Sequence, residues 1–473
     1  MGETQDLSRD LTHDIVPGLL PAGTPGVPVT LVSAADWAAV EAGLEPAQRA
    51  FAAATGFAPK AGRLALLPDA EGGLGRVLFG LGDPEAPAQD RLLAGKLPGL
   101  LPPGTYRLEG ASAPHEAALA WLMGSYGFRR YRSGGTETPR LAAPEDVDAD
   151  EIGRTAAAVA RGRDLVNTPA NDLGPVEIEA AVRALAERHG ARVGVTAGAD
   201  LAREFPLVHA VGAGSPRAPR LIDLTWGSET APRVTLVGKG VAFDTGGLDI
   251  KPSAAMLLMK KDMGGAAAAI AAADMVMGSG LPVRLRLIVP AVENAVSGEA
   301  FRPGDVLRSR AGLTVEIGNT DAEGRLILAD ALALADAEEP DLLIDFATLT
   351  GAARVALGPD LPALFTEDDA LADAIAAAGR AAIDPVWRLP LHPPYASLLD
   401  SKVADLNNVS GGPFAGAITA ALFLRRFAPR ARAHAHLDLY GWNPSTKPGR
   451  PEGGEVQTAR LVYALLKGRY PGA

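Results

Sequence analysis

The chain has 473 residues, a formal net charge of −11 at pH 7 and no cysteine. This length exceeds what one ordinary hydrophobic core accommodates, so we expect two domains. Hydrophobic residues make up 47% and charged residues 21%, which is typical of a globular protein and not of a disordered one. The negative charge argues against nucleic acid and anionic membranes as partners. The lack of cysteine excludes disulfides, thiolate metal ligands and a cysteine nucleophile.

The opening residues, MGETQDLSRD, are acidic and polar, and they lack the basic and then apolar pattern of a signal peptide. The most apolar run, at 264–280, is interrupted by Asp274 and is too short to cross a bilayer. We therefore expect a cytoplasmic protein with no membrane partner.

From about residue 27 to 140, short apolar segments such as VPVTLVSA, RLALLP and RVLFGLG alternate with helical ones. This pattern predicts a small α/β domain, and it contains no polar cluster that suggests chemistry. A polar, proline-marked segment at 137–150 and the helical stretch after it predict a linker. We expect an amino-terminal α/β domain at 1–140, a linker helix at 141–165 and a larger domain at 166–473.

The larger domain alternates buried strands with helices. We expect strands at 233–240, 283–290, 341–351 and 433–442, and helices at 264–280 and 325–339. Continuous apolar strands separated by helices predict a mixed, largely parallel sheet between helices. In such sheets, functional side chains gather on loops at the carboxyl ends of the strands.

The segment NTDAEGRLILAD (319–330) places Asp321, Glu323 and Arg325 at the start of an apolar helix. The structural interpretation is a capping box, in which Thr320 and Glu323 satisfy free N–H groups at the positive end of the helix. The alternative interpretation is chemical, and it depends on the charged residues elsewhere in the domain.

A second charged cluster lies in VGKGVAFDTGGLDIKP (237–252) and MLLMKKDMGG (256–265). Its members are Lys239, Asp244, Lys251 and Asp262. Singly, each fits a turn, a surface charge or a helix cap. With Asp321 and Glu323, however, they would bring four carboxylates into one crevice, and such a set needs cations among it. Two divalent metals together with lysine and arginine would neutralise it.

Any metal site here must use mostly oxygen ligands, since the chain has seven histidines and no HExxH motif. His434 and His436 alternate along a predicted strand and point the same way, but their apolar neighbours favour a role in the core. Serine chemistry has no support, because GxSxG is absent.

The blocks VGKGVAFDTGGLDIKP, MKKDMGGAA and NTDAEGRLILADAL resemble the signature blocks of the leucyl aminopeptidase (cytosol aminopeptidase) family. Further matching blocks are RDLVNTPANDLGP, SGEAFRPGDVL, DFATLTGA and GAITAALFL. The resemblance extends from about residue 150 to the carboxyl terminus and is weak in the first 140 residues.

The resemblance implies a metal-dependent aminopeptidase that removes N-terminal residues from peptides and uses two divalent ions, zinc or manganese. Asp244 and Glu323 would bridge the ions, Asp321 would complete the more exchangeable site, and Lys239 with Asp262 the tighter one. The implied catalytic residues are Lys251, which would stabilise the oxyanion, and Arg325, which would hold a bicarbonate ion as general base.

The resemblance also implies a pocket for the first side chain of the substrate, formed by Met259, Thr348, Gly351 and Tyr440. The family usually reads WAHLDIAG where this chain reads HAHLDLYG, so His434 replaces tryptophan and Tyr440 a small alanine. We expect Tyr440 to change the preference for the first residue, unless it turns outward and packs against Trp442 or a neighbouring subunit.

The family resemblance further implies a homohexamer acting on short or unfolded peptides. Two alternatives remain open from the sequence, a two-metal phosphoesterase and an aminopeptidase-like scaffold that binds nucleic acid. The lysine among the expected ligands argues against a phosphoesterase. The negative net charge and the complete set of metal-site residues argue against a scaffold that binds nucleic acid.

Overall fold

The protein is described here by a computed structural model, which describes residues 19–86, 89–134 and 137–472. The opening segment that argues against a signal peptide lies outside these residues. The chain divides into two units. The smaller holds the described residues up to Ala160 together with Ser445–Glu452, and the larger holds Arg161–Pro444 and the described residues from Gly453 onward.

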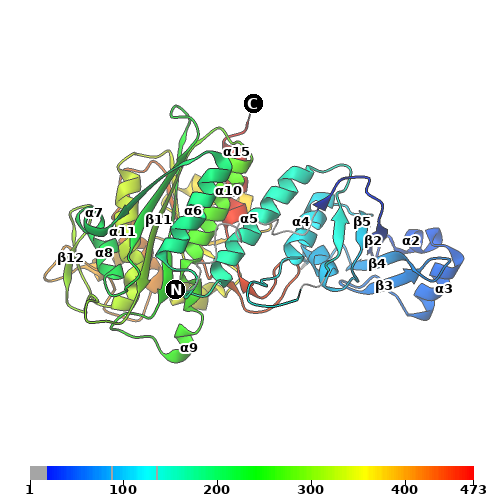
Figure 1. Cartoon of the computed structure of the whole chain (residues 1–473), viewed down its shortest axis with the longest axis horizontal. Coiled ribbons are helices and arrows are strands. Elements are labelled where there is room, and N and C mark those ends of the chain that lie inside the picture. Colours follow the sequence, from blue (N-terminus) through cyan, green and yellow to red (C-terminus); the bar gives the residue numbers. More distant parts are fainter. Residues whose placement is uncertain (1–18, 87–88, 135–136, 473) are drawn as a thin grey trace. The chain divides into compact units, whose positions relative to one another are not determined.

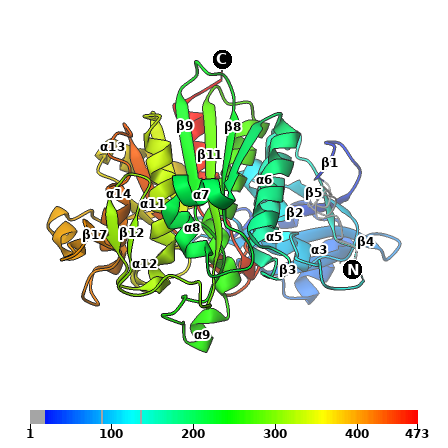
Figure 2. The ribbon, with the colours of Figure 1, turned by 60° about the vertical axis from the view of Figure 1, so that its left-hand side comes forward.

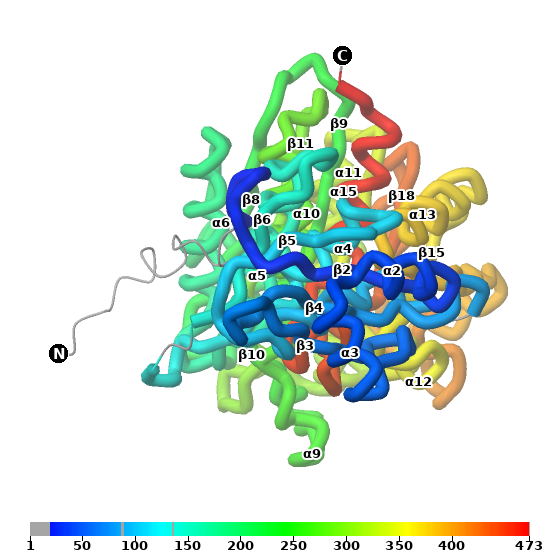
Figure 3. The backbone as a smooth tube through the Cα atoms, turned by 90° about the vertical axis from the view of Figure 1, so that its right-hand side faces the viewer, coloured from blue at the N-terminus to red at the C-terminus, as the bar shows by residue number. Residues whose placement is uncertain are grey.

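The smaller unit contains one six-stranded sheet in the order β1-β6-β5-β2-β4-β3. Strands β2 to β6 are labelled in Figure 3. The strands are β1 (Leu19–Leu20), β2 (Val27–Ser33), β3 (Leu64–Pro68), β4 (Leu74–Gly82), β5 (Thr105–Glu109) and β6 (Arg140–Ala142). Its helices are α2 (Trp37–Gly43), α3 (Pro46–Ala54), the 3-10 helix η1 (Leu93–Gly99) and α4 (Pro114–Gly124). Only the β3–β4 pair is antiparallel among the described strands of this sheet. The prediction of a small α/β unit is confirmed.

The larger unit is built on a nine-stranded sheet in the order β16-β15-β18-β14-β9-β11-β8-β7, with β10 also paired to β11. Its strands β9, β11 and β8 lie side by side in Figure 2. The strands are β7 (Arg192–Ala197), β8 (Arg220–Trp226), β9 (Arg233–Gly238), β10 (Gly240–Asp244), β11 (Arg284–Asn294), β14 (Leu342–Ala347), β15 (Ala363–Phe365), β16 (Trp387–Arg388) and β18 (His434–Asp438). The central strands β18, β14, β9 and β11 run parallel. Because β8, β7 and β15 pair antiparallel, the sheet is mixed and largely parallel, as expected.

Helices cover both faces of this sheet (Figures 1 and 2). One face carries α6 (Pro175–His189), α10 (Gly264–Gly278) and α15 (Ala459–Arg469), and the other carries α8 (Pro206–Gly212), α11 (Glu323–Asp336) and α14 (Gly416–Arg425). The remaining helices are α5 (Ala149–Asn167), α7 (Gly198–Glu204), α9 (Ser253–Met256), η2 (Met259–Met263), η3 (Thr320–Ala322), α12 (Gly351–Leu357), α13 (Asp369–Ala381) and η4 (Pro393–Leu399). Short strands β12 (Val306–Arg308), β13 (Thr314–Glu316) and β17 (Leu406–Asn407) form a third sheet, and β19 (Trp442–Asn443) pairs with β20 (Gly453–Gly454).

The alanine-rich helix α10 lies unusually close to the sheet. A Cβ at Gly265 would lie 2.2 Å from the backbone oxygen of Phe346, and one at Gly238 would lie 2.6 Å from Cα of Ala266. Small residues on both elements permit this approach, which explains the run of alanine and glycine at 264–273. Among the helices that the structure describes, none is both long and apolar enough to traverse a bilayer.

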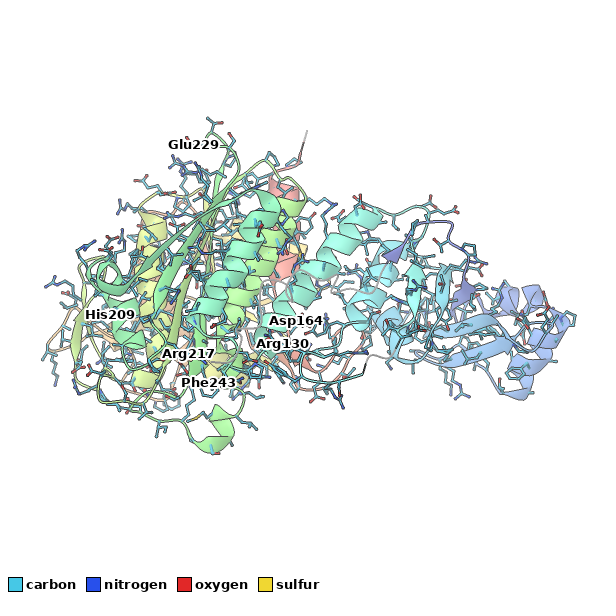
Figure 4. All side chains as sticks on the ribbon, viewed as in Figure 1. Arg130, Asp164, His209, Arg217, Glu229 and Phe243 are labelled. Atoms are coloured by element: carbon cyan, nitrogen blue, oxygen red, sulfur yellow. The ribbon has the colours of Figure 1, made fainter. Side chains whose placement is uncertain are left out.

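The carboxyl ends of the parallel strands carry the charged blocks. Strand β9 ends at Gly238, immediately before Lys239, and β14 ends at Ala347, before Thr348. Strand β10 ends at Asp244 itself, next to Phe243, which is labelled in Figure 4. The fold therefore gathers residues from distant parts of the sequence at one edge of the sheet.

Candidate active site

A cavity of about 510 Å³ opens at this edge of the larger unit. The expected site residues that line it are Lys239, Asp244, Lys251, Met259, Asp262, Asp321, Glu323, Thr348, Gly351 and Tyr440. The volume is sufficient for a small ligand. Arg325 is the expected residue that does not line the cavity.

Three buried carboxylates form the centre of the site. Asp244, Asp262 and Glu323 offer oxygen atoms that all lie within 4.8 Å of one another, and each residue is at most 3% exposed. Burial, followed by the negative charges of Glu323 and Asp262, raises the pKa of Asp244. Burial likewise raises the pKa of Asp262 to about 6, although Lys239 opposes the shift. Such a cluster is costly unless cations lie among its members.

Lys239 supplies one of these cations. Its Nζ lies 2.8 Å from Asp262 Oδ2 and 3.0 Å from Glu323 Oε1, and it donates a hydrogen bond of 2.9 Å to the Thr348 carbonyl oxygen. Burial alone would lower the pKa of Lys239, but the surrounding carboxylates raise it above its ordinary value. A Cβ at Gly324 would lie 2.5 Å from Cε of Lys239, so the glycine of DAEGR makes room for this lysine.

Lys251 supplies the second cation. Its Nζ lies 2.7 Å from Asp244 Oδ2 and 2.5 Å from Asp321 Oδ1. Burial alone would lower the pKa of Lys251, but the negative charges of Asp244 and then Glu323 raise it above its ordinary value. Each lysine is thus shared between two carboxylates, so two positive charges face four carboxylates and the set keeps an excess of negative charge.

Several carboxylate oxygens of the cluster still lack hydrogen-bond donors. Both oxygens of Glu323, Oδ2 of Asp262 and Oδ1 of Asp321 are buried and accept no hydrogen bond from the described residues, although lysine ammonium groups lie near three of these four atoms. Buried acceptors normally have donors. Oxygen atoms of this kind are suitable ligands for divalent cations, so the residues present fit a metal site.

The predicted capping box is wrong. The Thr320 hydroxyl donates a hydrogen bond of 2.6 Å to the Gly246 carbonyl oxygen and accepts one from the Asp249 N–H. It therefore joins two loops and caps no helix. Asn319 caps the short helix η3 in its place, by accepting from the N–H of Asp321. Helix α11 begins at Glu323 without a side-chain cap, and the Glu323 carboxylate faces Lys239.

Arg325 is 8% exposed and lies at the first turn of α11. Its Nη1 donates a hydrogen bond of 2.6 Å to the carbonyl oxygen of Asn408, while its buried Nε has no hydrogen-bond partner among the described residues. Burial lowers the pKa of Arg325 to about 10, against the charges of Glu323 and Asp438. The guanidinium is therefore a buried cation with an unused donor.

The histidine pair lies outside the cavity. His434 Nε2 and His436 Nδ1 lie 2.8 and 2.5 Å from the two carboxylate oxygens of Asp345 on the neighbouring strand β14. Burial opposes the shift, but the two histidines lower the pKa of Asp345 to about 2. Neither histidine lines the cavity.

Three polar residues at the site were not predicted. The Asn294 side-chain amide donates a hydrogen bond of 2.8 Å to Asp244 Oδ1 and so orients that carboxylate. Lys261 and Arg354 line the cavity beside Tyr440. Lys261 is adjacent to Asp262 in MKKDMGG, which could have identified it, whereas Arg354 gives no sequence signal because it lies on the exposed side of a short helix.

Tyr440 is among the residues that line the cavity, and the described residues show no ring contact between Tyr440 and Trp442. The ring centroid lies 4.5 Å from Lys261 Nζ and 5.3 Å from Arg354 Cζ. Trp442 instead lies near Lys260, whose Nζ is 5.5 Å from its ring centroid.

Comparisons with known proteins agree with this geometry. Residues 160–466 match the cytosol aminopeptidase family, catalytic domain, and residues 27–144 match the M17 aminopeptidase, N-terminal domain. A probable cytosol aminopeptidase of Roseiflexus castenholzii is 42% identical over 365 residues, covering 73% of this chain and 74% of that protein.

Solved structures show the same fold. The crystal structure of a cytosol aminopeptidase from Coxiella burnetii has a TM-score of 0.91 at 45% identity, covering 96% of this chain and 99% of that chain. The bottromycin maturation enzyme BotP in complex with Mn has a TM-score of 0.85 at 36% identity, covering 94% of this chain and 99% of that chain. A metal-dependent peptide hydrolase is what the buried carboxylates and the matched domains both indicate, and the chain belongs to the cytosol aminopeptidase family.

Proposed function

We propose that this aminopeptidase holds two divalent ions at the cluster of Asp244, Asp262 and Glu323. The observation that carries the proposal is the set of buried carboxylate oxygens within 4.8 Å of one another, several of them without hydrogen-bond donors. We assign Asp244 and Glu323 as bridging ligands, Asp321 to the more exchangeable site, and Lys239 with Asp262 to the tighter one. Lys239 would act as a ligand only as the neutral amine.

Zinc or manganese are the ions we propose, and the manganese complex of BotP supports the second. When bound, such ions polarise a carbonyl group and lower the pKa of water toward neutrality. The chain itself would contribute Lys251, which would donate a hydrogen bond to the oxyanion of the substrate. Its position between Asp244 and Asp321 supports this role, since these contacts hold its ammonium at the cavity wall.

For Arg325 we propose the role of holding a bicarbonate ion that serves as general base. The unpaired Nε supports an anion here, because this buried donor has no hydrogen-bond acceptor among the described residues. Arg325 does not line the cavity, so an anion held by it would lie beside the cavity or require a rearrangement of the Arg325 side chain.

The pocket for the first side chain of the substrate would be formed by Met259, Thr348, Gly351 and Tyr440, all of which line the cavity. The Tyr440 ring takes volume that a leucine side chain would occupy, and its hydroxyl offers a hydrogen bond. We therefore propose that leucine is not clearly the preferred first residue.

We also propose a cytoplasmic homohexamer that acts on short or unfolded peptides, with an amino-terminal domain at 1–140, a linker helix at 141–165 and a catalytic domain at 166–473. Exposed apolar side chains on the larger unit support association, among them Leu257, Val355 and Phe414, which are 79%, 81% and 82% exposed.

A substrate panel run on metal-stripped protein tests the central proposal. Chelation should abolish cleavage of aminoacyl substrates, and Mn²⁺ or Zn²⁺ should restore it. Calorimetric titration of the stripped protein should give two bound ions per chain. Full turnover in a sample shown to be free of metal would refute the two-metal site, and release of phosphate from a generic ester without peptide cleavage would favour a phosphoesterase.

A further inference from the structure

Two cations line the cavity without carboxylate partners. Lys261 is only 6% exposed and Arg354 lies on α12, and both belong to the same cavity wall. Among the described residues, neither side chain makes an ion pair or a hydrogen bond, and each instead lies near the Tyr440 ring. Arg354 is exposed to solvent, but a buried cation such as Lys261 is costly without an anion.

Among the described residues, no acidic residue of the cavity lies within ion-pair distance of either side chain. Asp262 and Glu323 are paired with Lys239, and Asp244 and Asp321 are paired with Lys251. No other acidic residue lines the cavity in the part of the chain that the structure describes. The described residues that line the cavity carry four carboxylates and four cations, so two divalent ions at the proposed site would make the lining positive, and a bound anion would offset that charge.

The two cations lie on the same wall of the cavity, around one aromatic ring. Lys261 Nζ lies 4.5 Å and Arg354 Cζ lies 5.3 Å from the centroid of the same ring, so their separation is at most the sum of these distances. The ring belongs to Tyr440, which lies in the proposed pocket for the first side chain of the substrate, together with Met259. Apolar atoms would therefore flank the stem of a bound side chain, with two positive charges near its end.

We infer that Lys261 and Arg354 select peptides whose first side chain carries a carboxylate, glutamate or aspartate. This inference rests on the proposed function and adds two specificity-determining residues to it. Arginine forms bidentate hydrogen bonds with carboxylates, and lysine adds a point charge, so the pair would favour a carboxylate over an amide of the same shape.

The same chemistry would also bind the terminal carboxylate of a dipeptide. Amidocoumarin substrates separate the two sources, because they have no terminal carboxylate. Glutamyl- and glutaminyl-amidocoumarin differ only in the charge of the first side chain, so the ratio of their kcat/KM values reports that charge and cancels general changes in activity. A second pair, leucyl-glycine and leucyl-glycinamide, reports the terminal carboxylate.

In the metal-loaded protein we expect the glutamyl substrate to exceed the glutaminyl one by about tenfold, the value of one charge-assisted hydrogen bond. Arg354→Gln and Lys261→Met should each reduce this ratio toward one. Arg354 lies on an exposed helix turn, so its variant tests the inference even if Lys261→Met does not fold. Arg426→Gln removes an exposed arginine outside the cavity and should leave the ratio unchanged.

A ratio of one or less in the parent protein, with leucyl substrates still cleaved, would overturn the inference and leave the aminopeptidase proposal standing. A high ratio that neither variant lowers would also overturn it. If the variants affect only leucyl-glycine relative to its amide, the anion is the terminal carboxylate and the inference is wrong. Loss of cleavage for every aminoacyl substrate in the metal-loaded parent would instead refute the proposed function.

Discussion

Replacing Lys251 with methionine should separate catalysis from metal binding. The Lys251 ammonium lies 2.7 Å from Asp244 Oδ2 and 2.5 Å from Asp321 Oδ1, so it occupies two carboxylates that we propose as ligands. An incoming divalent ion must compete with it. Methionine keeps a similar apolar length without the charge, and loss of one charge-assisted contact of roughly 1.5 kcal/mol should strengthen metal binding by about tenfold. Turnover should nevertheless fall ~10²–10³-fold, the usual effect of removing an oxyanion donor.

Calorimetric titration with Mn²⁺, metal content after gel filtration, and kcat on one aminoacyl substrate give the three readouts. Asp262→Ala and Glu323→Ala should lose metal and activity together, because both carboxylates belong to the buried cluster. Lys402→Met, an exposed lysine outside the cavity, should match the parent in every readout. If Lys251→Met loses metal as completely as the two acidic variants do, Lys251 is needed to hold the ions and its assignment as an oxyanion donor is wrong.

Three further predictions concern single residues. Arg325→Ala should lower kcat and be partly rescued by added bicarbonate, and the absence of any bicarbonate response in variant and parent would contradict the bound anion. Tyr440→Ala should raise kcat/KM for leucyl relative to alanyl substrates by about tenfold, since one methylene in such a pocket is worth ~1–3 kcal/mol, and an unchanged ratio would place the ring outside the subsite. Asp345→Asn should destabilise the fold by about 3 kcal/mol at pH 7, because it breaks a buried pair with two histidines. The lowered pKa of Asp345, about 2, means that its stabilising contribution is present above pH ~4 and is lost as pH falls toward 2, so melting temperatures of variant and parent should converge there.

The architecture of the larger unit was accessible from the sequence because its central strands are buried on both faces. Strands β9, β11 and β14 read as continuous apolar runs, which favours a parallel sheet between helices. The antiparallel edge strand β7 was not predicted, since RVGVTA alternates between exposed and partly buried positions and resembles many surface segments. The boundaries proposed at residues 140 and 165 stay predictions.

The capping error shows where local pattern misleads. Thr320 and Glu323 have the spacing of a capping box, and nothing within the segment distinguishes that use from another. The Thr320 hydroxyl is instead bound to Gly246, 74 residues earlier in the chain. A threonine hydroxyl can form its hydrogen bond with the start of the helix or with a neighbouring loop, and the tertiary structure determines which of the two forms. The consequence is functional, because Glu323 is left with two buried oxygens that no N–H group satisfies.

The charge of the proposed substrate pocket was the feature least accessible from the sequence. Tyr440 could be identified as unusual from a single segment, but its meaning depends on Lys261 and Arg354, which lie 179 and 86 residues away along the chain. Even the presence of lysines near the acidic cluster does not reveal a cationic pocket, since Lys239 and Lys251 are fully engaged by carboxylates. Lys261 and Arg354 are recognised as the lining cations without an ion pair only when each described charged residue of the cavity is compared with its neighbours in the structure. Where metal ligands recur in order along the chain, a sequence can indicate the reaction. The choice of substrate depends on which charges remain unpaired, and that requires the distances.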